Sequence, residues 1–523
     1  MSEHVQVLSG RYHDSVTLLA TSRAVAAVGG VSAAQVAMAT PLNLDVLATM
    51  GFAVPPASPD DLVVALRLDD AAEAGSVVAA ALAAMESSLA HRPSSQGSDD
   101  VEPPRTTAAA LRRTPAPLVL VSVPGEHAVA EAWDALDAGS SVMLFSDNVS
   151  VADEVALKRE AARRGLLVMG PDCGTAVVAG VGLGFANAVR PGPVSLVAAS
   201  GTGAQHLMCL LDAAGVGVRH CLGLGGRDLR ADVGGLGAEQ ALRLLADDEG
   251  TSLVVLVSKP ADPGVVTRLE GLASELGVAV EWAVLGAGRP DLTAVAAAVC
   301  SRVGVPAPTW PSWSPAATST ARQPGLLRGL FSGGTLCDEA LAVAGPVLGP
   351  IASNLSFDPS WPRLDASGPT ALSGALASAG HAMVDLGDDN LTVGRAHPMI
   401  DPSLRLEALA VAFADPRVRV VLLDVVLGHG PHPDPAAELG PAITAGRDGA
   451  GRPVDVVVSL TGAADDPQGT TDQARRLVAA GAHVHASNAA ATRHAVALTS
   501  ALSPPRSRNS RSIKELPVAE EAP

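Results

Sequence analysis

The feature that most constrains this chain is a repeated alternation between short aliphatic runs and longer helical segments. The runs form two series, at 118–123, 142–145, 166–169, 194–199 and 253–257, and at 329–331, 382–385, 418–424, 454–459 and 482–486. Near-continuous Val and Leu runs are typical of parallel strands that are buried on both faces. The sequence therefore predicts an α/β fold of tandem doubly wound parallel sheets.

Stretches rich in Pro, Ser and charged residues divide the chain into ordered blocks. We expect linkers at 91–116 and 303–324, and a disordered tail at 501–523. Residues 1–90 combine short strand candidates with two Ala-rich helical patterns, which predicts a small N-terminal α+β domain. The doubly wound units then occupy 117–302 and 325–500, and a length of 523 residues agrees with several domains.

Charge and cysteine content argue against several kinds of partner. The net charge is −18, with 54 acidic and 36 basic residues and no basic stripe, so neither nucleic acid nor an anionic membrane is expected to bind. The five cysteines are scattered without CxxC spacing, so we expect neither a disulfide framework nor a metal site. The first residues lack the pattern of a signal peptide and no apolar run has the length of a membrane span, which predicts a cytoplasmic protein.

Two strand-to-helix turns are candidates for an anion site. Small residues that open a helix present free backbone N–H groups and the positive end of the helix dipole, which suits a phosphate or a carboxylate. Each turn alone could equally be a tight turn with a capping hydroxyl, but the two occupy matched positions in similar blocks. The predicted phosphate-binding residues are Ser200, Gly201, Thr202, Gly203, Ser332, Gly333, Gly334 and Thr335.

The loop at 424–436 is a candidate for holding a substrate carboxylate. It follows an aliphatic strand and contains Gly428, His429 and Gly430. His429 and His432 have HxH spacing, but no third ligand is evident nearby, so a metal is not favoured.

The loop at 385–401 carries an unusual concentration of polar residues. It contains Arg395 and His397 after a predicted strand. A solvated loop is the alternative, but the order His-Pro-Met is unusual for such a loop, and we favour a site role.

Motifs in both blocks resemble those of succinyl-CoA synthetase. The stretch 168–174 (VMGPDCG) is similar to the Gly-Pro-Asn-Cys-Pro-Gly motif of the α subunit, and Val194–Gly203 to the strand that enters its phosphate-facing helix. The third block resembles the carboxy-terminal domain of the β subunit, with Asp385–Gly387 at its Asp-Leu-Gly-Gly turn. This resemblance implies a CoA-binding-like Rossmann domain at 117–192, and flavodoxin-like domains of α type at 193–302 and of β type at 325–500. The candidate cofactor-binding residues are Gly170, Pro171, Asp172 and Cys173.

Both halves on one chain, together with 146–148 (SDN) and 394–401 (GRAHPMID), identify the chain as a member of the FdrA family over roughly residues 1–490. This family is linked to carbamoyl transfer between carbamoyl phosphate and oxamate in allantoin breakdown, alongside companion subunits. The resemblance therefore implies a carbamoyl or acyl phosphate and a small carboxylate as substrates, and companion proteins as partners.

The chain departs from the synthetases at the residues that handle ATP. The segment that would carry the phosphorylated histidine reads Trp282–Arg289 (WAVLGAGR), without a histidine, and Lys259 falls near the position of the acidic residue that would orient it. The ATP-grasp domain is absent and no P-loop replaces it. Alone, such a chain cannot make an acyl phosphate from ATP, but two helix N-termini and Lys259 could position a preformed one and stabilise the leaving phosphate.

The leading hypothesis is therefore a carbamoyltransferase subunit. Lys259 would neutralise the phosphate, and Gly428–Gly430 with Arg395 or His397 would hold the acceptor carboxylate. One alternative is an acyl-CoA ligase of the succinate-CoA type, ADP- or GDP-forming, in which His397 takes over the shuttle. Another is a non-catalytic scaffold that binds CoA or an acyl phosphate. No cofactor is required, and CoA binding stays open because the linker and the N-terminal domain replace the segment with the initial Gly-rich loop.

Overall fold

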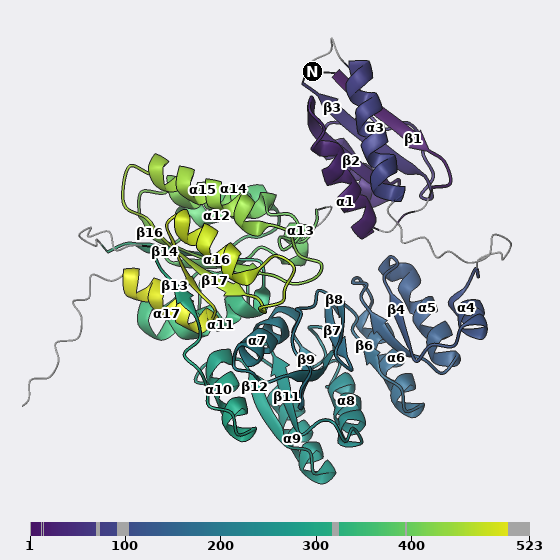
Figure 1. The fold of residues 1–523 in the computed structure, drawn as a ribbon, viewed down its shortest axis with the longest axis vertical. Coiled ribbons are helices and arrows are strands. Elements are labelled where there is room, and N and C mark those ends of the chain that lie inside the picture. Colours follow the sequence, from purple (N-terminus) through teal and green to yellow (C-terminus); the bar gives the residue numbers. More distant parts are fainter. Residues whose placement is uncertain are drawn as a thin grey trace, which may run out of the picture.

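In the computed structural model the chain forms four units, each built around its own sheet (Figure 1). The structure describes residues 2–11, 13, 15–69, 74–90, 104–315, 324–392 and 395–499. The predicted disordered tail lies outside these residues, as do 91–103 and 316–323 of the two predicted linkers.

The N-terminal unit is the small α+β domain expected from the sequence. Its antiparallel sheet has the order β1-β3-β2. Helices α1 and α3 pack on one face through Val25 and Met85, while Leu47 of α2 packs on the other. The elements are β1 (Ser2–Leu8), α1 (Ser15–Ala26), β2 (Val31–Met38), α2 (Pro41–Thr49), β3 (Leu62–Leu68) and α3 (Ala74–Ala90).

The second unit is a parallel three-stranded sheet of order β4-β5-β6. Its elements are α4 (Thr107–Arg113), β4 (Leu118–Val121), α5 (Gly125–Asp137), β5 (Ser141–Leu144), α6 (Val151–Arg163) and β6 (Val168–Met169). Helix α4 lies inside the stretch expected as a linker, where that prediction was wrong. Thr106 caps this helix, and the hydroxyl of Thr107 donates a hydrogen bond to Glu131 of α5, which fixes α4 against the unit.

The third unit contains a six-stranded sheet of order β12-β11-β9-β10-β7-β8. Strands β9, β10, β11 and β12 are parallel, whereas β7 and β8 form an antiparallel hairpin at one edge. This hairpin comes from the segment expected in the preceding domain, so the second sheet begins earlier than residue 193. The elements are β7 (Thr175–Val178), β8 (Val181–Gly184), β9 (Val194–Ala199), α7 (Gly201–Ala213), β10 (Val218–Gly223), α8 (Leu236–Ala246), β11 (Leu253–Ser258), α9 (Pro263–Leu276), β12 (Val280–Val284) and α10 (Leu292–Arg302).

The fourth unit has a six-stranded sheet of order β13-β18-β17-β16-β14-β15, which is parallel except for β13. Strand β13 belongs to the segment expected as a Pro-rich linker, and it extends the sheet by pairing with β18. The elements are β13 (Ser312–Trp313), β14 (Leu326–Phe331), α11 (Gly334–Leu348), α12 (Pro369–Ser378), β15 (Ala382–Asp385), α13 (Asp389–Thr392), α14 (Ser403–Ala414), β16 (Val418–Val426), α15 (Pro435–Gly449), β17 (Asp455–Thr461), α16 (Thr470–Ala479), β18 (Ala482–His485) and α17 (Asn488–Thr499).

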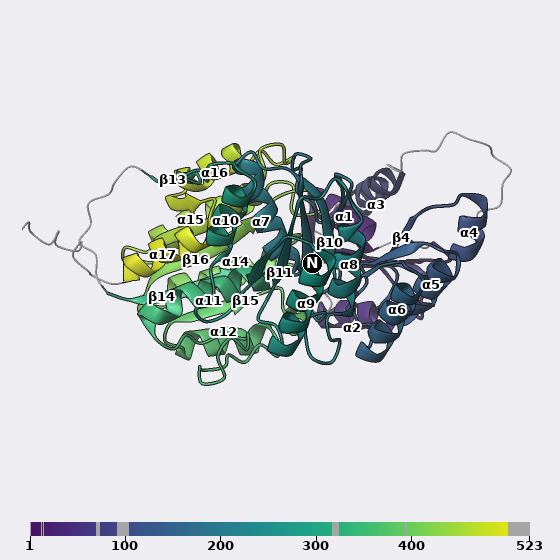
Figure 2. The same cartoon turned by 90° about the horizontal axis from the view of Figure 1, so that it is seen from below.

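The third and fourth units share one apolar core. Leu207 and Leu210 of α7 belong to the same buried cluster as Leu336 and Ala340 of α11. In both views the fourth unit and the second unit lie on opposite sides of the third (Figures 1 and 2). Burial of this cluster brings the N-termini of α7 and α11 together, at the carboxyl ends of β9 and β14. No helix among the described residues is long and apolar enough to cross a membrane.

Candidate functional site

The two predicted phosphate-binding turns meet at one place in the structure. Ser200 caps α7 by accepting a hydrogen bond from the Gly203 amide at 3.0 Å, and its hydroxyl lies 2.6 Å from that of Thr335 on α11. A Cβ at Gly203 would stand 2.8 Å from Cγ2 of Thr335, and one at Gly333 would stand 2.9 Å from Thr202. These glycines therefore allow the two helix ends to approach each other closely. We call the place where Ser200–Gly203 of the α7 turn meets Ser332–Thr335 of the α11 turn the helix junction.

Two amides of the α11 turn are already occupied by a carboxylate of the same chain. Asp424, at the end of β16, accepts hydrogen bonds from the amides of Ser332 and Gly333 at 2.7 and 2.8 Å, and from the Ser332 hydroxyl at 2.9 Å. Asp424 thus satisfies these donors, so a phosphate could bind to Ser332 and Gly333 only by displacing this carboxylate. Sequence reasoning placed Asp424 at the end of a strand but did not foresee this contact across 92 residues.

Other helix-end amides remain available in the part of the chain that the structure describes. The amides of Gly201 and Thr202 in α7, and of Gly334 and Thr335 in α11, have no hydrogen-bond acceptor there. Gly201 is exposed, whereas the side chains of Thr202 and Thr335 are buried. The positive ends of two helix dipoles thus point into the helix junction.

Lys259, the residue that follows β11, lies at the helix junction. Its side chain is half-buried and forms neither a hydrogen bond nor an ion pair with any described residue. The Lys259 Nζ is 2.8 Å from the point where a Cβ of Gly334 would stand, and Oδ2 of Asp385 is 2.4 Å from the same point. Lys259 is therefore a cation that faces the start of α11 without a partner of its own.

Two buried carboxyl groups near Lys259 were missed as site residues by the sequence analysis. Asp385, at the end of β15, is 6% exposed, and burial raises its pKa to about 7 although Lys259 opposes the shift. Asp338, one turn into α11, is 5% exposed, and burial raises its pKa to about 6, again against Lys259. Their positions were visible in the sequence, since Asp385 ends a strand and Asp338 lies four residues after Gly334 on the same helix face.

The motif at 170–173 contributes one side chain to the surroundings of Lys259. Asp172 is exposed, and its carboxylate lies among the charges of Asp389, Asp147, Lys259 and Arg227. Its φ of +57° turns the backbone into the left-handed region.

The other residues of this motif are used in packing. The Cys173 thiol is buried and donates to the Thr175 carbonyl at 3.6 Å, and burial raises its pKa to about 12. Gly225 packs so closely that a Cβ there would stand 2.1 Å from the Pro171 carbonyl oxygen, while one at Gly170 would stand 2.3 Å from that of Leu144. The role of Gly170, Pro171, Asp172 and Cys173 in binding a cofactor stays a prediction.

His397 lies beside the helix junction as a neutral histidine. Its Nδ1 accepts a hydrogen bond from the Met399 amide at 3.2 Å, and its Nε2 is 2.5 Å from the point where a Cβ of Gly387 would stand. Burial, followed by the charge of Arg405, lowers the pKa of His397 to about 4. Because Nδ1 acts as an acceptor, the proton of the neutral ring belongs on Nε2.

Arg395 is not brought into the helix junction. Its exposed guanidinium lies 3.6 Å from Glu407 of α14 and contacts none of the other predicted site residues. The predicted catalytic role of Arg395 finds no support in this placement, because its charge is directed to the surface of α14.

The loop at Gly428–Gly430 forms a contact between two units. The His429 amide donates to the Ala186 carbonyl at 2.8 Å, and the Gly428 amide donates to Gln468 at 3.0 Å. A Cβ at Gly428 would stand 2.6 Å from the Ala186 oxygen, and Gly428 has a φ of +112°. The amides of Gly428 and His429 are therefore taken up by contacts within the chain, and the role of this loop in holding a carboxylate stays a prediction.

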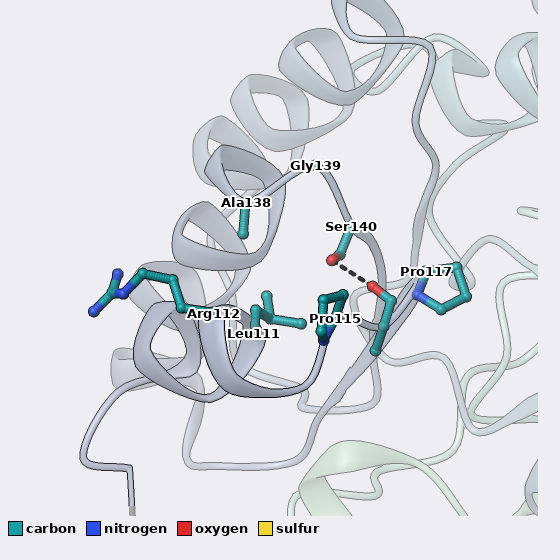
Figure 3. A pocket seen from close by; sticks show the side chains of 8 residues that line it. Leu111, Arg112, Pro115, Pro117, Ala138, Gly139 and Ser140 are labelled. Carbon is teal, nitrogen blue, oxygen red and sulfur yellow. Dashed lines mark hydrogen bonds between the residues drawn. The ribbon is translucent and has the colours of Figure 1, made fainter.

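Two cavities among the described residues lie away from the helix junction. A cavity of about 450 Å³ separates α4 from the start of β5, where the Ser140 hydroxyl donates to the Ala116 carbonyl at 2.7 Å (Figure 3). A second, of about 240 Å³, lies between Pro350 and His381. Neither is lined by a predicted site residue, and no described group of three or more His, Cys, Asp or Glu residues is arranged to hold a metal ion.

Two families match parts of the chain. Residues 1–104 match the family described as AllF, heavy metal-associated domain, and residues 330–498 match the CoA-ligase family. The first cysteine of the chain is Cys173, so the stretch that matches the heavy metal-associated domain offers no thiolate ligand.

Curated proteins and solved structures are similar to this chain over stretches of different length. The uncharacterized protein YahF of Escherichia coli K12 is 35% identical over 456 residues, which are 83% of this chain and 86% of YahF. The α subunit of an ADP-forming succinate–CoA ligase from Methanothermobacter thermautotrophicus is 29% identical over 143 residues, 27% of this chain and 47% of that subunit. A solved structure of a dinucleotide-forming acetyl-coenzyme A synthetase from Candidatus Korarchaeum cryptofilum overlaps 78% of this chain and 89% of its own, with 14% identity and a TM-score of 0.29.

Proposed function

The chain belongs to the FdrA family, fused relatives of the succinyl-CoA synthetase subunits, and we propose that it is the large subunit of a carbamoyltransferase. The donor would be carbamoyl phosphate and the acceptor oxamate or a similar small carboxylate, in purine or allantoin catabolism. Companion subunits would complete the enzyme. The coarser assignment, to enzymes of the CoA-ligase type, follows from the matched family and from the succinate–CoA ligase subunit that resembles the chain.

The observation that carries the proposal is the unpaired Lys259 at the start of α11. A cation and the open amides of Gly334 and Thr335 face the same space, and both favour a phosphate group. Carbamoyl transfer needs a carbonyl carbon held in position and a leaving phosphate whose charge is stabilised. The open amides of Gly201 and Thr202 across the helix junction offer a place for the carboxylate of the acceptor.

The state of His397 favours transfer from a preformed phosphate over ATP-driven ligation. A histidine that accepts a phosphoryl group must present a nitrogen lone pair, but Nδ1 of His397 is engaged by the Met399 amide and the proton of the neutral ring occupies Nε2. The segment Trp282–Arg289 holds no histidine that could act instead. An acyl-CoA ligase activity would therefore require a rearrangement of the His397 loop.

The test is an assay of phosphate release by the chain purified with the products of neighbouring genes. With carbamoyl phosphate and oxamate, we expect release that Lys259→Met lowers about 100-fold, since one stabilising charge at a leaving group has that weight. Arg163→Met, which removes an exposed cation of α6, is the matched control and should not change the rate. No release by the wild-type complex would contradict the proposal. Release that requires ATP, CoA and a carboxylic acid would instead assign an acyl-CoA ligase, and binding without turnover a scaffold.

A further inference from the structure

The two helices that meet at the helix junction are tied together a second time, deeper in the core. His206 of α7 and Glu339 of α11 are both fully buried, and each stands six residues after the N-cap of its helix. These N-caps are Ser200 and Gly333. At a rise of about 1.5 Å per residue, both side chains lie roughly 9 Å along their helices from the junction, and so at matching depths.

Asn488, the first residue of α17, contacts both side chains. Its backbone amide donates a hydrogen bond to Nε2 of His206 at 3.2 Å, and its side-chain Nδ2 donates to Oε2 of Glu339 at 2.7 Å. The same Nδ2 donates to the Leu336 carbonyl of α11 at 3.0 Å. One buried residue of a third helix therefore bonds to both helices whose ends form the junction.

The partners of Asn488 are themselves held in place. Nε2 of His206 accepts the Asn488 amide, so the proton of the neutral ring is on Nδ1 and is donated to the Thr461 hydroxyl at 2.7 Å. The Oε1 atom of Glu339 accepts the Leu292 amide at 2.6 Å. Neither side chain can therefore turn away from Asn488 without breaking another buried hydrogen bond.

The Asn488 side chain makes these contacts at a cost. The Leu336 carbonyl can only accept, so Nδ2 must face it, and Oδ1 then lies where no donor of the described residues reaches it. A buried acceptor without a partner is unfavourable, and an apolar side chain of similar shape would avoid it. What the asparagine supplies at this position is its N–H groups, which bond to α7 and α11.

Resting on the proposed function, we propose that Asn488 is a positioning residue of the helix junction, which fixes the angle and the register between α7 and α11. The first contact between the helices joins the hydroxyls of Ser200 and Thr335 at 2.6 Å, and Asn488 supplies a second contact roughly 9 Å away. Two separated contacts prevent rotation about either one. The open amides of the two helix ends thereby keep the spacing that holds a phosphate beside the carboxylate of the acceptor.

Three variants remove or keep these bonds one helix at a time. Asn488→Leu keeps the approximate shape of the side chain but donates no hydrogen bond from it to Leu336 or Glu339. His206→Leu cannot accept the Asn488 amide, whereas the side-chain oxygen of His206→Gln can take the place of Nε2. The first two variants should therefore release α11 and α7 respectively, and the third should hold α7 in place.

Thr499→Val is the matched control. Thr499 is buried on α17, like Asn488, but its hydroxyl donates to the Val496 carbonyl of α17 itself at 2.7 Å. The change removes a buried hydrogen bond of the same helix without removing a bond to α7 or α11. Any effect that follows from loss of stability alone should therefore also be present in Thr499→Val.

Hydrogen exchange resolved by peptide reports on the helix ends whether or not the complex is active. We expect exchange at the start of α11 in Asn488→Leu, and at the start of α7 in His206→Leu, to be at least about tenfold faster than in the wild type. Helix α14, which belongs to the other core of the fourth unit, should exchange as in the wild type. His206→Gln and Thr499→Val should leave both helix starts protected.

Carbamoyl transfer is measured in the complete complex, at a temperature where circular dichroism shows every variant to be folded. Misaligned amides weaken the transition state more than they weaken the first attraction of the phosphate to Lys259. We therefore expect kcat to fall at least about tenfold in Asn488→Leu and His206→Leu, while KM for carbamoyl phosphate changes less than about threefold. His206→Gln and Thr499→Val should keep kcat within about twofold of the wild type.

The outcomes separate the role of Asn488 from the proposed function. Faster exchange confined to the helix starts, in a complex that does not transfer carbamoyl groups, would support the second contact and contradict the proposed reaction. Exchange in Asn488→Leu that stays at the wild-type rate, or that rises equally in α14, would overturn the positioning role. An unchanged kcat in Asn488→Leu, or an equal loss of kcat in His206→Gln and His206→Leu, would also overturn it.

Discussion

Replacement of Lys158 by methionine should loosen the attachment of the second unit to the third. Lys158 lies on α6 and is 2% exposed. Its ammonium group is 2.7 Å from Glu154, 2.7 Å from Asp228 and 2.9 Å from the Leu224 carbonyl, and Asp228 belongs to the loop after β10 of the third unit. Because Glu154 lies on α6 itself, two of these buried interactions, with Asp228 and with the Leu224 carbonyl, tie α6 to the neighbouring unit.

The expected effect follows from what Lys158→Met leaves behind. Methionine fills the space of the lysine stem but leaves two buried carboxylates without their shared cation, and removal of one partner of a buried ion pair costs about 3–5 kcal/mol. Arg227, 2.9 Å from Glu154, and the amides of Gly237 and Ala238, which donate to Asp228, offset part of this cost. We therefore expect the lower end of the range, about 3 kcal/mol.

Hydrogen exchange resolved by peptide is the suitable assay, because a chain with several units need not unfold in one step. A loss of about 3 kcal/mol corresponds to exchange of the α6 amides that is about 100-fold faster. Arg163→Met, at a side chain that is 68% exposed on the same helix, should leave exchange unchanged, because its ion pair is largely in water. Adding Glu154→Gln to Lys158→Met should restore part of the protection. Exchange in Lys158→Met within threefold of the wild type would refute the reasoning.

Three further changes test the packing and the site. Gly428→Ala should destabilise the contact between units by about 1–3 kcal/mol in urea denaturation, since its φ of +112° and the nearby Ala186 oxygen both oppose a Cβ, whereas Gly271→Ala, within α9 and with open space around it, should not destabilise. Burial lowers the pKa of His206 to about 4, so the unfolded chain binds its proton more tightly; stability should fall as pH drops from about 6.5 to 4, and this slope should flatten in His206→Gln thermal scans. Arg395→Ala should retain full carbamoyl transfer, because its guanidinium faces Glu407 at the surface; a large loss would contradict this placement.

The strand-to-helix order of the two large sheets could be read from the sequence because each strand is a continuous aliphatic run. The hairpin of β7 and β8 was not predicted, because its two strands are short and partly exposed, contain glycine and show little hydrophobic periodicity. Helix α4 was missed because an Ala-rich turn inside a Pro- and Ser-rich stretch resembles a linker. In each case a contact with a distant segment, and not the local sequence, decides the structure.

The candidate site, like the fold, could be predicted from the sequence only in part. The convergence of Ser200–Gly203, Ser332–Thr335 and Lys259 could be expected, because strand-to-helix turns of parallel sheets lie on one edge. The hydrogen-bond and charge partners of these residues could not be predicted from the sequence. That Asp424 takes the amides of Ser332 and Gly333, and that Asp385 faces Lys259, depends on the twist and register of neighbouring strands, which set where each side chain points.

Contact between the two helix ends limits where a phosphate can lie. The hydroxyls of Ser200 and Thr335 lie 2.6 Å apart, and a Cβ added at Gly203 or Gly333 would clash with the other helix end. There is therefore no room for a ligand between α7 and α11. A phosphohistidine held by both helix dipoles at once is thus excluded in this arrangement, and an anion must bind beside one helix. Beside α11 the open amides of Gly334 and Thr335 lie close to Lys259, so the proposed phosphate would lie at this helix end and not between the two helices.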